Sequence, residues 1–172
     1  MDEVEIIKLS PDRWEEYRDL RLRSLKEDPE AFGILYEDAV KEDEIFWRKL
    51  LEIAEKEIDH WKFFAELNGK LVGIVSARIT IPAGDGDTVK VQEVFVANEA
   101  RGKGVGKKLM NYLFKEISKH PQFKKAKIKV FTSQKPAIGM YESVGAKIVD
   151  KIEESWPDGR TNETYVMEKA LP

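Results

Sequence analysis

The segment Arg-Gly-Lys-Gly-Val-Gly at positions 101–106 constrains the fold of this 172-residue chain more than any other. It lies between an apolar, strand-like run at 91–96 and a helix-like stretch at 107–118. Glycines at every second position allow tight turns and positive φ, and they let backbone N–H groups approach a ligand closely. A helix that begins here adds unpaired N–H groups and the positive end of its dipole. The junction therefore predicts a strand–loop–helix unit that binds a phosphate group.

The glycine spacing excludes two common nucleotide-binding motifs. The dinucleotide fingerprint Gly-x-Gly-x-x-Gly, counted from Gly102, requires glycine at position 107, where this chain has Lys107. A P-loop requires Ser or Thr after Gly-Lys, but Lys107 is followed by Lys108. The remaining pattern, Arg-Gly-x-Gly-x-Gly after Val-Phe-Val, resembles the coenzyme A pyrophosphate loop of the GNAT superfamily of N-acetyltransferases.

A second segment resembles the same superfamily. Residues 134–145 read Gln-Lys-Pro-Ala-Ile-Gly-Met-Tyr-Glu-Ser-Val-Gly, similar to the superfamily pattern Asn-x-x-Ala-x-x-Leu/Met-Tyr-x-x-x-Gly-Phe. A single glycine-rich basic loop is equally compatible with a tight turn that carries solvated lysines. Two signatures in the expected order, separated by one helix and one strand, favour the resemblance.

Apolar periodicity and turn residues predict the elements of the fold. We expect strands at 4–9, 61–67, 71–81, 89–96, 126–131, 146–153 and 164–170, and helices at 13–26, 42–57, 107–118 and 137–143. Asn68-Gly69 suits a type I′ turn between two strands, 82–87 reads as a loop, and 156–160 reads as a turn.

The predicted order β-α-α-β-β-β-α-β-α-β-β is the GNAT order over nearly the whole chain. The expected class is α/β (α+β), with a mixed, mostly antiparallel sheet of about six to seven strands flanked by about four helices. No Pro/Gly/Ser-rich linker divides the sequence, so we expect one N-acetyltransferase domain over residues 1–172.

Composition narrows the chemistry. The chain has no cysteine, which argues against disulfides, a thiolate nucleophile or a cysteine-ligated zinc, and His60 and His120 lie far apart in sequence. We therefore expect no metal site. No 18-residue apolar run and no basic-apolar leader is present, so we expect a cytoplasmic protein with no membrane partner.

Charge is distributed unevenly along the chain. Residues 1–60 hold 19 acidic and 10 basic side chains, whereas residues 97–135 hold 2 acidic and 11 basic ones. The basic segment contains the glycine loop, where a polyanionic cofactor would lie. A solvated lysine-rich face is the simpler reading for most of these lysines. Nucleic-acid binding is a poorer fit, since no helix-turn-helix, zinc-finger or aromatic RNA-binding pattern accompanies the charge.

The resemblance implies a binding site for acetyl-CoA. In the superfamily, the strand before the loop pairs with pantetheine, beside a β-bulge that separates two strands, and the loop holds the pyrophosphate mainly through backbone amides. Glutamine replaces the more usual asparagine near the pantetheine arm. The cofactor-binding residues that this implies are Val94, Phe95, Val96, Arg101, Gly102, Lys103, Gly104, Val105, Gly106, Lys107 and Gln134.

The resemblance also implies two catalytic residues. Tyr141 is the expected general acid, because a phenol can protonate or stabilise the coenzyme A thiolate that leaves. Glu93 is the first choice for the general base that takes a proton from the amine. The structural alternatives are a core aromatic residue for Tyr141 and a carboxylate facing solvent or an arginine for Glu93. Bulk water or a carboxylate of the acidic N-terminal helices could also serve as the base.

These observations predict an enzyme that transfers acetyl from acetyl-CoA to a primary amine, of a small molecule or a protein, by direct attack in a ternary complex. The alternatives are a coenzyme A-binding regulatory or interaction module without turnover, and a nucleic-acid-binding protein. Acids in the variable segments favour a cationic acceptor, and formation of a homodimer stays open. These acids include Glu27, Asp28, Glu37, Asp38, Asp85 and Asp87.

Overall fold

The computed structural model describes residues 3–79, 86–156 and 159–172. The strands in this part of the chain are β1 (Glu5–Ile7), β2 (His60–Leu67), β3 (Lys70–Ile79), β4 (Thr88–Val96), β5 (Lys125–Phe131), β6 (Lys147–Ser155) and β7 (Thr161–Ala170). The α-helices are α1 (Trp14–Glu27), α2 (Tyr36–Ala39), α3 (Glu44–Glu55), α4 (Val105–Ile117) and α5 (Lys135–Ser143). Short 3₁₀ turns, η1 (Pro11–Arg13) and η2 (Asn98–Ala100), precede α1 and follow β4.

The strands form one seven-stranded sheet in the order β1-β2-β3-β4-β5-β7-β6. Every neighbouring pair is antiparallel except β4 and β5, which run parallel. The predicted mixed, mostly antiparallel sheet is confirmed, with the larger of the two expected strand numbers. Because β4 and β5 are parallel, a crossover must connect them, and α4 supplies it.

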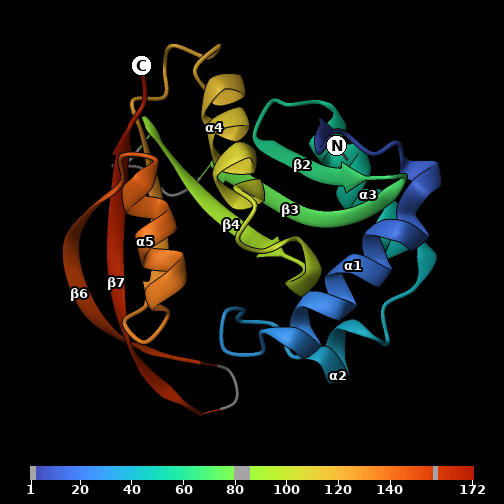
Figure 1. Cartoon of the computed structure of the whole chain (residues 1–172), viewed down its shortest axis with the longest axis horizontal. Coiled ribbons are helices and arrows are strands. Elements are labelled where there is room, and N and C mark those ends of the chain that lie inside the picture. Colours follow the sequence, from blue (N-terminus) through green and yellow to red (C-terminus); the bar gives the residue numbers. More distant parts are fainter. Residues whose placement is uncertain (1–2, 80–85, 157–158) are drawn as a thin grey trace.

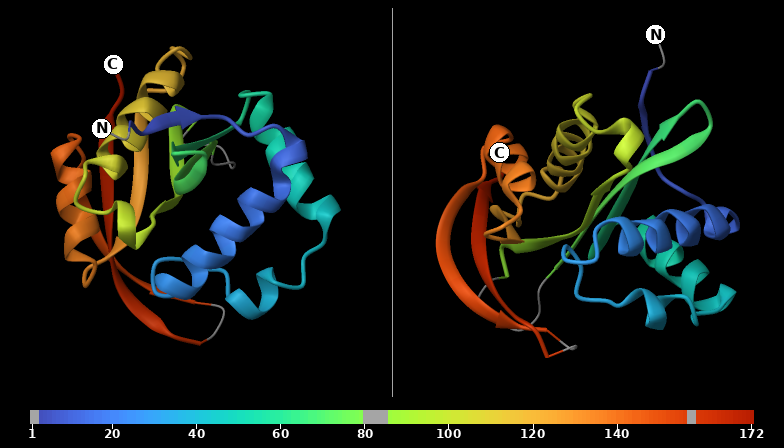
Figure 2. Two further views of the ribbon diagram at one scale, coloured as in Figure 1. Left: turned by 45° about the vertical axis from the view of Figure 1, so that its right-hand side comes forward. Right: turned by 60° about the horizontal axis from the view of Figure 1, so that its bottom comes forward.

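The helices cover both faces of the sheet. Figure 2 shows α4 and α5 on one face and α1 and α3 on the other. Helix α4 contacts β2 and β3, while α1 contacts β3 and α3 contacts β2. The hairpin of β6 and β7 extends along the edge of the molecule toward the segment that joins α1 and α2 (Figure 1). The core between these layers is rich in aromatic side chains, including the fully buried Tyr17, Trp47, Trp61, Phe63 and Phe64.

The predicted elements are present, with shifted ends. The helix expected at 42–57 begins at Glu44, because Asp43 caps it by accepting a hydrogen bond from Phe46 N at 3.0 Å. Helix α2 was not predicted, since four residues are too few to show a helical period. The first strand is shorter than expected. Residues 80–81 of the strand expected at 71–81, residues 82–85 of the expected loop and residues 157–158 of the expected turn lie outside the described residues.

Two irregularities in β4 open the middle of the sheet. Strand β4 pairs with β5 only at Thr88–Lys90, which face Lys125–Lys127. Beyond these pairs the two strands separate. On its other side β4 carries a β-bulge, because Ile74 faces Phe95 while Ser76 faces Gln92, so that two residues of β4 oppose Val75 alone.

Glu93 lies in the bulge with φ of +49°, one of three non-glycine residues with positive φ in the described chain. A bulge bends its strand and increases the local twist. The bent strand therefore diverges from β5 at the level of Glu93 and Val94, and this divergence positions the site described below.

Gly73 marks a close approach between β3 and α4. A Cβ atom at this position would lie 2.9 Å from Leu109 Cδ1 and 3.2 Å from the Phe95 carbonyl oxygen. We expect Gly73→Ala to lower the free energy of unfolding by about 1–3 kcal/mol through overpacking. Urea unfolding checks this.

The matched control is Gly139→Ala in α5, where no atom lies within 4 Å of the added Cβ. We expect this variant to gain up to about 1 kcal/mol from the higher helix propensity of alanine. Equal stability of the two variants would show that the contact of Gly73 with α4 is not tight.

Candidate active site

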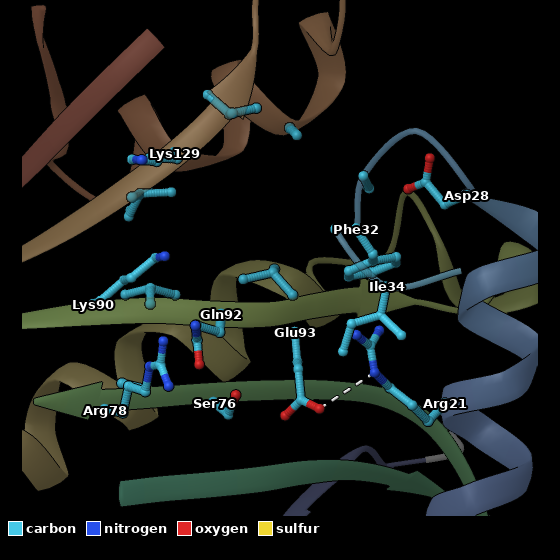
Figure 3. A pocket seen from close by; sticks show the side chains of 18 of the residues that line it. Arg21, Asp28, Phe32, Ile34, Ser76, Arg78, Lys90, Gln92, Glu93 and Lys129 are labelled. Carbon is cyan, nitrogen blue, oxygen red and sulfur yellow. Dashed lines mark ion pairs between the residues drawn. The ribbon is translucent and has the colours of Figure 1, made fainter. Parts of the chain in front are cut away.

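A pocket of about 640 Å³ lies where β4 and β5 diverge. Figure 3 shows walls from β3, β4 and β5, from α1 and from the segment after it. Residues of β2, α3, α5 and the end of β6 also line the pocket. Apolar walls with a few polar groups that point inward are typical of small-molecule sites. The pocket is therefore the candidate site of chemistry.

Four of the predicted site residues line this pocket. They are Glu93, Val94, Gln134 and Tyr141. The others do not line it: Phe95 is buried in the core, Val96 is the last residue of β4, residues 101–104 form the loop, and Val105, Gly106 and Lys107 begin α4. The prediction therefore covers two neighbouring regions, a pocket and a loop, with β4 running from one to the other.

The loop has the backbone conformation that its glycines predict. Gly102 and Gly104 have φ of +72° and +77°, and no atom lies within 4 Å of a Cβ placed on either residue. Gly104 is the N-cap of α4, whose first N–H groups have no partner within the helix. The Arg101 side chain donates from Nε to the Val96 carbonyl oxygen at 2.8 Å, which ties the loop to the end of β4. Open space, free N–H groups and the helix dipole fit a phosphate group.

Glu93 is held in an ionic cluster beneath the bulge. Its carboxylate accepts hydrogen bonds from Lys62 Nζ at 2.6 Å and from the Tyr17 hydroxyl at 2.8 Å, and it forms an ion pair with Arg21 Nε at 3.3 Å. The side chains of Arg21 and Lys62 are 6% and 8% exposed. A single carboxylate thus neutralises part of the charge of two nearly buried cations.

This environment makes Glu93 a weak base. Burial alone would raise the pKa of Glu93, but the charges of Lys62 and Arg21 outweigh that effect and lower its pKa to about 2. An efficient general base has a pKa near the working pH. The geometry is closer to the structural alternative, a carboxylate facing an arginine, and the catalytic assignment of Glu93 stays a prediction.

Tyr141 and Asp28 both line the pocket and lie close enough to interact electrostatically. Tyr141 is 6% exposed. Burial raises the pKa of Tyr141 above its ordinary value, and the charge of Asp28 adds to the shift. Burial likewise raises the pKa of Asp28, against the opposing effects of Arg101 and of a hydrogen bond with Gln134. The phenol therefore keeps its proton at neutral pH, next to a carboxylate that is a stronger base than an exposed aspartate.

The sequence analysis did not identify the partners of Glu93. Arg21 has a detectable signal, because it shares the buried face of α1 with Tyr17, Leu20 and Ser24, where apolar residues are expected. Lys62 has a weaker one, a charge between aromatic residues in a buried strand. Neither signal indicates which carboxylate is the partner, since the three residues come from three different elements.

We expect Glu93→Gln to destabilise the protein near neutral pH by about 3–5 kcal/mol, because it leaves two nearly buried cations without a carboxylate. The folded-state pKa of Glu93, about 2, lies below its ordinary value of 4.5. Its contribution is thus fully present above about pH 4.5 and is lost as the pH falls toward 2. Urea unfolding of both proteins at pH 7 and pH 3 should show the difference narrowing at the lower pH.

The control for this measurement is Glu52→Gln on the exposed surface of α3, which should match the wild type at both pH values. A Glu93→Gln protein as stable as the wild type at pH 7 would contradict the stabilising role of the cluster.

Comparisons with known proteins agree with this geometry. The family model described as "Acetyltransferase (GNAT) family" matches residues 12–146. A search of curated protein sequences gives no significant match. Among the described residues, no helix is long and apolar enough to cross a lipid bilayer.

Solved structures share the fold at low sequence identity. A GNAT-family acetyltransferase from Streptococcus pneumoniae is 17% identical with a TM-score of 0.87, and the match covers 99% of this chain and 100% of that one. The yncA protein of Salmonella typhimurium, solved with its cofactor acetyl-CoA, is 17% identical with a TM-score of 0.80, covering 99% and 95%. The paia N-acetyltransferase of Thermoplasma acidophilum, in complex with coenzyme A, is 18% identical with a TM-score of 0.73, covering 98% and 99%.

The match to the family model spans both segments that the sequence analysis singled out, up to the end of the second one. The sheet order, the bulge in β4 and the divergence of β4 from β5 accompany the same residues. The chain therefore belongs to the GNAT acetyltransferase family and is an acyltransferase.

Proposed function

We propose that this acetyltransferase transfers the acetyl group of acetyl-CoA to a primary amine by direct attack in a ternary complex. The observation that carries the proposal is the divergence of β4 from β5 beside the bulge, which opens a pocket with Tyr141 on its wall. The amine nitrogen would attack the thioester carbonyl carbon, the carbon–sulfur bond would break, and coenzyme A would leave as a thiolate. No cysteine is present to form an acetyl-enzyme. Holding amine and thioester in contact would supply much of the rate.

The cofactor would lie along β4 and across the loop. After Lys90 the edge of β4 that faces β5 has no pairing partner in the described sheet, so the backbone of Val94–Val96 is available to the amides of pantetheine. The pyrophosphate would bind the N–H groups of residues 102–107, which need not contribute through their side chains. Gly106 lies between Val96 and Met140 of α5, the nearest atoms at 3.6 Å from its Cβ position. The first turn of α4 therefore packs against the end of β4 and against α5.

Tyr141 would donate to the departing sulfur. A thiol of ordinary acidity has a pKa near 8.5, well below that of this phenol. Complete proton transfer to the thiolate is therefore unfavourable, whereas a hydrogen bond from the phenol stabilises the charge as it develops. Tyr141 would act through that hydrogen bond.

Asp28 is a better candidate than Glu93 for the proton acceptor. Both carboxylates line the pocket, but Glu93 is neutralised by Lys62 and Arg21, whereas the pKa of Asp28 is raised and its charge reaches Tyr141. Asp28 also follows the last residue of α1, among the acidic N-terminal helices. It would hold the ammonium group of the acceptor and take its proton directly or through water.

The Gly104→Asp variant tests the position of the cofactor. It adds a side chain and a negative charge where the pyrophosphate would bind, and we expect acetyl-CoA affinity to fall by roughly tenfold or more, measured by calorimetry. The matched control is Gly69→Asp in the β2–β3 turn, since Gly69 has φ of +75° and equally open surroundings. Both variants carry the same backbone strain. Equal loss of affinity in the two would remove the loop from the cofactor site.

Thiol release from acetyl-CoA in the presence of an amine panel tests the reaction itself. We expect Tyr141→Phe to slow release by roughly a hundredfold with unchanged acetyl-CoA affinity. Tyr112→Phe is the control, because Tyr112 packs against Phe63 and does not line the pocket. Asp28→Asn should lose most activity at low pH and recover at high pH, where the amine deprotonates without a base.

Three outcomes would oppose the proposal. Tight acetyl-CoA binding with no thiol release for any amine would indicate a binding module. Normal turnover of Tyr141→Phe would return Tyr141 to a packing role. A pH-dependent loss for Glu93→Gln, in protein shown to be folded, with none for Asp28→Asn, would restore Glu93 as the base.

A further inference from the structure

Some charged groups of the pocket form ion pairs with one another, and others have no ion-pair partner among the residues that the structure describes. Glu93 is bound to Lys62 and Arg21, and Glu154 receives a hydrogen bond from Lys129 at 2.6 Å. The remaining charged residues of the pocket are separated according to the sign of their charge. Asp28 and Glu30 lie in the segment after α1, and Arg78 and Lys90 lie on the sheet (Figure 3).

Arg78 and Lys90 face each other across two strands. They are register partners in the antiparallel pair of β3 and β4, and both line the pocket. Like charges directly opposite one another destabilise a sheet. Lys90 also faces Lys127 of β5 in the parallel pair. Other like charges face each other in this sheet, Glu5 with Glu66 and Glu153 with Glu163, but those glutamates do not line this pocket. Neither Arg78 nor Lys90 has a carboxylate within ion-pair distance among the residues that the structure describes.

The surroundings of Lys90 increase the cost of this arrangement. Its ammonium group is half-buried. Burial lowers the pKa of Lys90, and the charges of Lys129 and Arg78 lower it further, while Glu154 only partly opposes them. An anion bound between Arg78 and Lys90 would remove the repulsion and satisfy the guanidinium donors.

The cationic pair lies within reach of the reaction centre. Lys90 and Gln92 both line the pocket, and Val94 lies at the bulge where the pantetheine arm is proposed to begin its pairing with β4. Four residues of extended strand span about 13 Å, and the long side chains of Lys90 and Arg78 shorten that separation. An acceptor that carries an amine and, several bonds away, an anionic group would place the amine at Asp28 and the anionic group at Arg78 and Lys90.

We infer that the acceptor is a small amine that carries an anionic group, a carboxylate or a phosphate, which binds between Arg78 and Lys90. The inference rests on the proposed function and narrows its substrate class. A pocket of about 640 Å³ suits a small molecule. Of the acids that favoured a cationic acceptor in the sequence analysis, Asp28 is the one that lines this pocket, and Asp85 lies outside the described residues. The pocket is therefore suited to a zwitterion rather than to a polycation.

Equilibrium binding in the presence of coenzyme A, which lacks the acetyl group, tests the inference without turnover. The probes are amines of matched length: 4-aminobutanoate, its carboxamide, 1,4-diaminobutane and 3-aminopropyl phosphate. A second set based on 6-aminohexanoate tests a longer spacing. We expect an anionic member to bind at least roughly tenfold more tightly than the amide or the diamine of its set. The ratio of carboxylate to phosphate affinity identifies the preferred anion.

The variants Arg78→Gln and Lys90→Gln should each abolish this preference. Lys70→Gln at the exposed β2–β3 turn should keep it. Melting curves establish that the variants fold, and Lys90→Gln should melt at or above the wild-type temperature because it removes the repulsion. Equal binding of anion, amide and diamine, or a preference that survives both substitutions, would overturn the inference.

Thiol release with the same amines separates this inference from the proposed function. Release that is fastest with an anionic acceptor supports both. Release that is fastest with the diamine supports the proposed function and overturns the inference. Preferential anion binding without any release would retain the anion site and overturn the proposed acetyl transfer.

Discussion

The ion pairs of Glu93 with Arg21 and Lys62 link the fold of this protein to its chemistry. A carboxylate on a bulged residue with positive φ bonds a cation from α1 and another from β2. Those contacts join three elements that surround the pocket. Removing one member of such a buried cluster leaves the others desolvated and uncompensated. The conformation of β4 at the bulge, and with it the opening toward β5, therefore depends on a cluster that lies beneath the reacting groups.

Because β4 and β5 diverge, the candidate site has two parts, an unpaired strand edge and a glycine loop, that offer different groups to a ligand. The unpaired edge of β4 offers backbone groups at Val94–Val96, and the loop from Arg101 offers N–H groups at the start of a helix. Backbone groups in rigid elements are fixed by the sheet and the helix, so they bind a ligand without loss of side-chain entropy. Under the proposed function, the loop would bind the cofactor through its backbone without contact from its lysine side chains. The charge of those lysines would raise the local concentration of a polyanion at longer range.

Electrostatic environment separates the roles of chemically similar groups in the pocket. Glu93 and Asp28 are both carboxylates on its wall, yet one has its pKa lowered by two cations and the other has its pKa raised by burial. Lys129 and Lys90 are both lysines, yet Glu154 compensates the first, and Arg78 repels the second. Where most charges of a site are paired within the protein, a bound substrate would form its ion pairs with the charges that have no partner.

The sequence by itself determined the fold class, the order of elements and the two signature segments. These are local properties, because glycine spacing favours a loop with positive φ and apolar periodicity indicates helices and strands. The prediction for Tyr141 came from the resemblance of its segment to the superfamily pattern. The sequence also indicated that the two segments belong to one superfamily. The family model confirms that membership over 12–146.

Tertiary structure decided which charges meet. The cationic partners of Glu93 are 72 and 31 residues away in sequence, and the register that places Arg78 opposite Lys90 is shifted by the bulge. The pKa difference between Glu93 and Asp28 depends on burial and on neighbours from other elements, which no local pattern contains. The sequence therefore indicated the strand and the helix that carry the candidate site residues, and only the folded sheet decided which charges of the pocket are paired with one another.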